Sequence, residues 1–100
     1  MSGNAIEMRR HSDGAIYRFL PQSPLGGFPR YKRADKDIWI LRNPDFGWIV
    51  WDAGEQALMG RPWDLALKEQ GGTPPECVWV SRKDANAFVY RLAFVAEPGA

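Results

Sequence analysis

The sequence is poor in the residues from which many catalytic and metal-binding sites are built. Its single cysteine, Cys77, excludes an internal disulfide framework and a cysteine-rich zinc site. Its single histidine, His11, excludes a metal site made of several histidines. Thirteen basic residues are balanced by 12 acidic ones, and the formal net charge of +1 gives no general case for binding nucleic acid or an anionic membrane. We therefore expect neither a metal nor a cofactor.

Long apolar runs are also missing from the chain. No segment approaches the ~18 consecutive apolar residues of a membrane span, and residues 1–12 lack the apolar core of a signal peptide. A single free thiol suits a reducing compartment. We expect an intracellular, cytoplasmic protein without a membrane partner.

Tryptophan, by contrast, is abundant. Five tryptophans among 100 residues are a large apolar load for one small domain. They lie in short segments rich in β-branched and aromatic residues, separated by turns that contain proline and glycine. The sequence therefore predicts a mainly β domain, a small antiparallel sheet that is curled or barrel-like, with five or six strands.

The same signals suggest where the domain begins and ends. We expect residues 1–12 to form a flexible arm, residues 13–96 to form a single β domain and residues 97–100 to form a tail. Residues 21–27 contain prolines and glycines and are expected to form a loop. At most one short helix is expected, near residues 62–70, where a proline suits the first helical turn.

A hairpin over residues 37–51 is the strongest structural prediction. Strand-forming segments flank a turn that ends at Gly47, where glycine permits a positive φ. Ile38 and Ile40 lie on one face and Trp39 lies on the other. Because both faces are apolar, the sheet is expected to be curled, closed or covered rather than wet on one side. We expect Trp39 and Trp48 in the core.

A second hairpin resembles the first when the chain is shifted along itself. The shift that places Trp39 on Trp79 also aligns other apolar positions of the two segments. Either the hairpins arose by duplication or two aromatic hairpins of similar loop length align by chance. Two copies are too few for a propeller or a solenoid.

Three runs of residues resemble a recurring sequence pattern: GGFPRYKR (26–33), DIWIL (37–41) and GWIV (47–50). The pattern is that of small Trp-rich modules that recur, often in tandem, in proteins of protists and algae. The match covers about residues 14–95 and departs at Gly26, where the pattern prefers asparagine. The resemblance implies a β fold and a non-enzymatic role, and it implies no site residues.

The tryptophans also suggest where a ligand would bind. Trp51 ends a strand and must point away from Trp48 and the core, and Trp63 lies at the start of a weak helical segment. With Arg61 nearby, these rings form the predicted binding site of an interaction module. A protein or peptide is the expected ligand, and a carbohydrate or a second copy of the chain is the alternative. The competing interpretation is that the two rings pack on each other.

Two other functions remain open at this stage. The carboxylates Asp52, Glu55 and Asp64 could form an acid/base cluster in a small enzyme. No nucleophile with a matching base is evident in the sequence, however, and we therefore expect that the protein is not an enzyme. The basic and aromatic segment 30–39 could bind single-stranded nucleic acid. Because acidic residues are interspersed in that segment, a solvated edge strand is the preferred interpretation and nucleic acid is not an expected partner.

Overall fold

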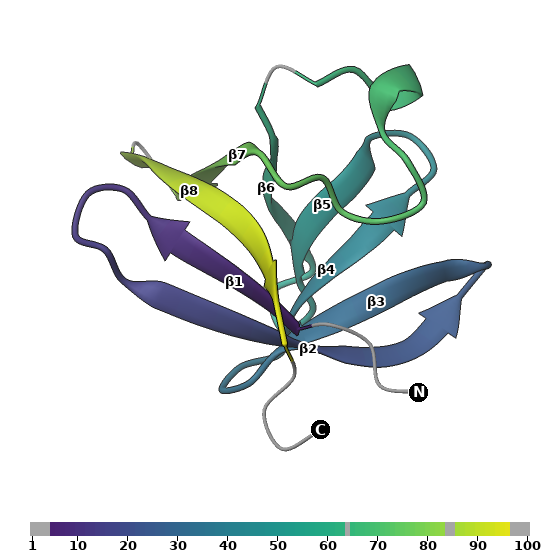
Figure 1. The fold of residues 1–100 in the computed structure, drawn as a ribbon, viewed down its shortest axis with the longest axis horizontal. Helices are drawn as coiled ribbons and strands as arrows, with labels where there is room; N and C mark the ends of the chain where they lie inside the picture. Colours follow the sequence, from purple (N-terminus) through teal and green to yellow (C-terminus); the bar gives the residue numbers. More distant parts are fainter. Residues whose placement is uncertain (1–4, 64, 84–85, 97–100) are drawn as a thin grey trace.

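The computed structural model is a closed antiparallel barrel in which each strand pairs with the next and the last strand pairs with the first (Figure 1). The structure describes residues 5–63, 65–83 and 86–96. Within these ranges the strands are β1 (Ala5–Arg10), β2 (Ile16–Leu25), β3 (Phe28–Arg33), β4 (Ile38–Asn43), β5 (Gly47–Asp52), β6 (Ala57–Pro62), β7 (Val78–Lys83) and β8 (Asn86–Val95). The mainly β, barrel-like prediction is confirmed, with eight strands rather than five or six.

β1 corrects residues 5–10 of the arm expected over residues 1–12, while residues 1–4 lie outside the described residues. Ile6 and Met8 are buried inside the barrel, whereas Arg9 is exposed, so the segment has the period-two alternation of a strand. Met8 is followed directly by Arg9 and Arg10, and these charges obscure the apolar alternation of Ile6 and Met8 in the sequence. The folded unit begins by residue 5, and the tail expected over residues 97–100 lies outside the described residues.

β2 corrects part of the loop expected over residues 21–27, because the strand continues to Leu25. Its pairing with β1 reaches only to Phe19. Among the described residues, the stretch that contains Pro21 and Pro24 therefore has one strand neighbour, β3. Proline cannot donate a hydrogen bond to a ladder, and a strand with a single neighbour tolerates it.

Between β6 and β7, the described residues 63 and 65–77 contain one 3₁₀ turn, η1 (Leu67–Glu69). The short helix expected near residues 62–70 is limited to this turn, because Pro62 belongs to β6 instead of starting a helix. Across the described ranges, no helix combines the length and the apolar character that crossing a lipid bilayer requires.

One end of the barrel is covered by residues 65–77, and we call it the closed end (Figure 1). The backbone N–H of Trp48 donates to Oε1 of Gln70 at 2.8 Å, and the indole Nε1–H of Trp48 donates to the carbonyl oxygen of Gly71 at 3.0 Å. The indole Nε1–H of Trp79 donates to the carbonyl oxygen of Pro75 at 3.0 Å. Two buried tryptophans thus fix the covering segment, and each finds a partner for its polar N–H.

The barrel interior holds a continuous apolar core. It consists of Ile6, Met8, Phe19, Tyr31, Ile38, Ile40, Trp48, Val50, Trp79 and Leu92. The prediction that Trp48 lies in the core is confirmed. The same prediction for Trp39 is wrong, because Trp39 pairs with Trp51 on the outer face and is half-buried there.

The two tryptophan-led hairpins do not correspond face for face. Trp39 lies on the outer face of β4, whereas Trp79 on β7 is buried in the core. The shift that aligns these residues therefore places an outward side chain on an inward one. Matching residue types along the sequence do not reproduce matching positions in the barrel.

Candidate functional site

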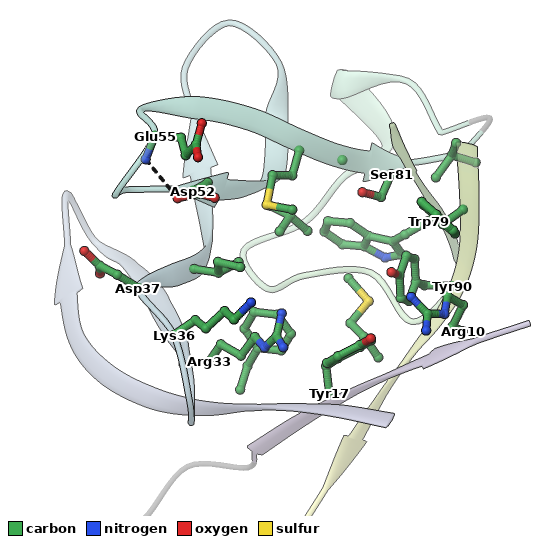
Figure 2. Close-up of a pocket in the computed structure, with 18 of the residues that line it drawn as sticks. Arg10, Tyr17, Arg33, Lys36, Asp37, Asp52, Glu55, Trp79, Ser81 and Tyr90 are labelled. Carbon is green, nitrogen blue, oxygen red and sulfur yellow. Dashed lines mark hydrogen bonds between the residues drawn. The ribbon is translucent and has the colours of Figure 1, made fainter. Parts of the chain in front are cut away.

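The barrel interior is hollow at the end opposite the closed end. A cavity of about 730 Å³ lies beside the connections at residues 34–37 and 53–56 (Figure 2). Because consecutive strands of this barrel are antiparallel neighbours, every second connection between strands lies at the same end. Odd-numbered strands therefore end at the cavity, and even-numbered strands begin there. We call this the open end.

Apolar side chains of the core line the deeper part of the cavity, which we call the floor. They are Met8, Phe19, Ile38, Val50 and Trp79, all of them buried. They come from β1, β2, β4, β5 and β7. The floor therefore presents aliphatic, thioether and indole surface that can receive an apolar group.

Cations and aromatic rings alternate along one side of the cavity. Arg10 ends β1, Tyr17 is the second residue of β2 and Arg33 ends β3, so the strand order places Tyr17 between the two arginines. The guanidinium carbon of Arg33 lies 4.2 Å from the centre of the Tyr17 ring, and the guanidinium carbon of Arg10 lies 5.6 Å from it. The Tyr90 ring lies 6.0 Å from that of Tyr17. Cation–π contacts between a guanidinium group and an aromatic ring are stabilising. We call Arg10, Tyr17 and Arg33 the cationic wall.

An aspartate holds each arginine of the cationic wall from outside. Nε and Nη2 of Arg10 donate to the two carboxylate oxygens of Asp13 at 2.9 and 2.7 Å. The hydrogen bonds of Arg10 to Asp13, and then to Tyr90, raise the pKa of Arg10, and the same ion pair lowers the pKa of Asp13 to about 2.

Arg33 is held in the same way. Its Nε and Nη2 donate to the carboxylate of Asp35 at 2.6 and 3.1 Å, and this ion pair lowers the pKa of Asp35. In both pairs the carboxylate is the more exposed member. The side chains of Asp13 and Asp35 are 52% and 63% exposed, against 22% and 16% for Arg10 and Arg33.

Carboxylates occupy another side of the cavity, where Asp37, Asp52 and Glu55 lie across from Arg10 and Tyr90 (Figure 2). Asp52 Oδ1 accepts a hydrogen bond from the backbone N–H of Glu55 at 3.0 Å, and Asp37 Oδ1 accepts one from the indole of Trp39 at 2.7 Å. Both therefore have structural partners in the loops that they occupy.

The predicted carboxylate cluster is brought to the cavity in part. Asp52 and Glu55 line it, whereas Asp64 lies outside the described residues. Over the residues that are described, no three His, Cys, Asp or Glu side chains are grouped so that they could hold a metal ion.

The predicted aromatic site lies elsewhere and is divided. Trp63 is 65% exposed and lines a shallow groove with Arg61, whose guanidinium carbon lies 5.2 Å from the centre of the Phe46 ring. Trp51 pairs across the sheet with Leu58 on β6, well before the strand reaches Trp63. The structure therefore brings Arg61 and Trp63 together and leaves Trp51 apart from them.

The basic segment 30–39 is divided between the two faces of the sheet. Arg33 reaches the cavity, whereas Arg30 lies over the outward ring of Trp39, with its guanidinium carbon 5.1 Å from the ring centre. Arg30 also donates to the carbonyl oxygen of Ser23 at 2.8 Å. A nucleic-acid base would need to stack on a face of the Trp39 ring, and Arg30 already lies over this ring.

Sequence reasoning missed the cationic wall and Tyr90. Arg10 falls in the expected arm, and Arg33 falls in the basic segment for which the sequence favours a solvated edge strand. The alternation Ile6, Met8, Arg10 carries the missing signal, because in a strand these three positions share a face. Recognising that strand would have placed Arg10 inside the barrel.

No related protein is found that would indicate a function for the cavity. Comparison of the chain with known protein families, with curated proteins and with solved structures finds no match.

Proposed function

We propose that the protein is a non-enzymatic binding module that holds a small amphiphilic molecule in the cavity at the open end of the barrel. The observation that carries this proposal is a cavity of about 730 Å³ inside a closed barrel. Pockets for small organic ligands have volumes of about 300–1,000 Å³. The cavity is therefore of the size that takes such a ligand.

The lining of the cavity has the division that an amphiphile requires. The floor is apolar, whereas the groups nearer the opening are arginines, Lys36, carboxylates and the hydroxyls of Tyr17, Ser81 and Tyr90. Burial of apolar surface would supply affinity, at about 25 cal/mol per Å². A few fixed polar groups would set the orientation of the ligand.

A binding role agrees with the module expected from the sequence, but the ligand and its location differ. From the sequence, a protein or peptide is expected to bind at Trp51, Trp63 and Arg61, on the outer surface. An interior cavity takes a small molecule instead. The non-enzymatic part of the proposal is supported by Asp52 of the predicted carboxylate cluster, whose Oδ1 accepts a backbone N–H within its own loop.

The test uses N-phenyl-1-naphthylamine, a neutral apolar dye whose fluorescence rises when it leaves water. We expect saturable binding of one dye per chain. Ser81→Phe places a ring in the cavity, because Ser81 lines it, and should abolish the fluorescence rise. Val89→Phe is the matched control, since Val89 is exposed on the outer face of β8, and should leave binding unchanged.

Unfolding midpoints in urea show that both variants are folded. Absence of saturable dye binding to the folded wild type would contradict the proposal. So would equal binding by the wild type and a folded Ser81→Phe variant, because the dye would then lie outside the cavity.

A further inference from the structure

Both arginines of the cationic wall are held by an aspartate along the same edge of the guanidinium. In Arg10 and in Arg33, Nε and Nη2 donate to the carboxylate. This side-on pairing does not use Nη1 of either guanidinium, because a guanidinium carries five N–H donors in a fixed plane. Arg10 has a second acceptor in the hydroxyl of Tyr90, so the end-on edge of Arg33 is the better placed of the two for a ligand. Both side chains line the cavity.

The aspartates fix the arginines without filling the cavity. Asp13 and Asp35 are largely exposed, whereas the arginines that they hold are mostly covered. The ring of Tyr17 supports both guanidinium groups from between them. Donors that are already held in place lose less conformational entropy when a ligand binds, and pre-organisation of this kind favours binding.

The opening of the cavity is electrically polarised. Arg10 lies across the cavity from Asp37, Asp52 and Glu55 in Figure 2. Lys36, the residue before Asp37, also lines the cavity on that side. A negatively charged group beside Asp52 and Glu55 would meet like charges, while the same group at the cationic wall would meet an arginine. The lining therefore distinguishes the two directions in which a charged amphiphile could enter.

We infer that the ligand of this cavity is an organic anion whose carboxylate, sulfonate or phosphate group binds the cationic wall at the end-on edge of Arg33, with Arg10 adding positive charge from the other side of Tyr17 and with the apolar body of the ligand directed to the floor at Trp79. This inference rests on the proposed function and adds the charge and the orientation of the ligand. Arginine suits these acceptors because its planar donors match two oxygens of one anionic group.

The test compares two ligands that share a chain and differ in charge. Decanoate and decylammonium, both below their micelle-forming concentrations, compete with bound N-phenyl-1-naphthylamine at neutral pH. We expect decanoate to displace the dye at a concentration at least about tenfold lower, since one hydrogen bond to a charged group changes affinity by about that factor or more. Raising the salt concentration should weaken decanoate and spare the dye.

Variants locate the effect. Arg33→Gln should raise the decanoate concentration needed for displacement about tenfold, after correction for the affinity of the same variant for the dye. Arg30→Gln is the matched control: it removes a cation from the same strand, but from the outer face, and should leave both measurements unchanged.

The outcomes separate this inference from the proposed function. If the dye does not bind the wild type, the proposed function fails. If the dye binds but decylammonium displaces it as readily as decanoate, the cavity stands and the inference is wrong. A preference for decanoate that survives unchanged in Arg33→Gln would also overturn the inference, and the salt titration of the wild type decides the matter if Arg33→Gln does not fold.

Discussion

Gln70 and Trp48 lie 22 residues apart, and Oε1 of Gln70 accepts the backbone N–H of Trp48 at 2.8 Å. This contact depends on the neighbouring glycine. A Cβ atom on Gly47 would lie 2.5 Å from Oε1 of Gln70. The turn between β4 and β5 therefore needs glycine at this position for two reasons: φ is +82°, and a side chain would displace the amide that ties the closed end to β5.

Gly47→Ala should destabilise the protein more than Gly27→Ala. Both glycines have a positive φ, of 82° and 83°, and alanine in that conformation costs about 1–2 kcal/mol. A Cβ at Gly27 meets nothing within 4 Å. We expect Gly47→Ala to cost about 1 kcal/mol more, because it also breaks a hydrogen bond. Equal shifts of the urea unfolding midpoint would show that the Gln70 contact contributes nothing.

Trp48→Ala and Trp39→Ala should differ strongly in their effect on stability. Trp48 is fully buried and its indole N–H is bonded, so its loss should cost about 3–5 kcal/mol. Trp39 is half-buried on the outer face, and its loss should cost about 1–2 kcal/mol. Chemical denaturation measures both values. If Trp39→Ala costs as much as Trp48→Ala, the inward and outward assignment of β4 is wrong.

Stability should fall as the pH decreases below the ordinary carboxyl range. The ion pair with Arg10 lowers the pKa of Asp13 from 3.8 to about 2. Because the folded pKa is the lower one, the pair contributes its full stability above pH 3.8 and loses it as the pH falls toward 2. Asp13→Asn should therefore lose less stability than the wild type over this interval, as urea titrations at a series of pH values will measure. Parallel losses in the two proteins would refute the assignment.

Iodide should quench a fraction of the tryptophan fluorescence that depends mainly on Trp63. Its side chain is 65% exposed, whereas Trp48 and Trp79 are buried. Trp63→Phe should lower the quenchable fraction clearly, and Trp51→Phe should lower it slightly because Trp51 is half-buried. An unchanged fraction in Trp63→Phe would mean that this ring is covered in solution.

A strand can be predicted from the sequence when the residues that indicate it lie within the strand itself or in the adjoining turn. The hairpin over residues 37–51 is predictable because dense strand-forming residues flank a turn that ends in glycine. β6 is not predictable, because Gly60 lies within it and weakens the strand pattern. Packing requires that glycine: a Cβ there would lie 2.9 Å from the carbonyl oxygen of Val80 on β7. The residue that conceals the strand is the one that lets it approach its neighbour.

The candidate site was harder to predict than the fold because its residues meet only when the barrel closes. Arg61 and Trp63 could be selected from local sequence, and they do share a groove. Arg10 and Arg33 come from strands that are not neighbours, with Tyr17 on the strand between them. Their convergence depends on the inward direction of β1, which the adjacent arginines in the sequence obscure.

Pairing between β1 and β8 joins the two ends of the described chain, with Ala5 opposite Val95. A ribosome releases β1 first and β8 last. Until β8 emerges, one edge of β1 has N–H and C=O groups without a strand partner, and such edges invite pairing with other chains. Closing so long a loop also makes folding slow. The barrel therefore completes only after synthesis of its last strand, and the nascent chain is most vulnerable to aggregation just before that moment.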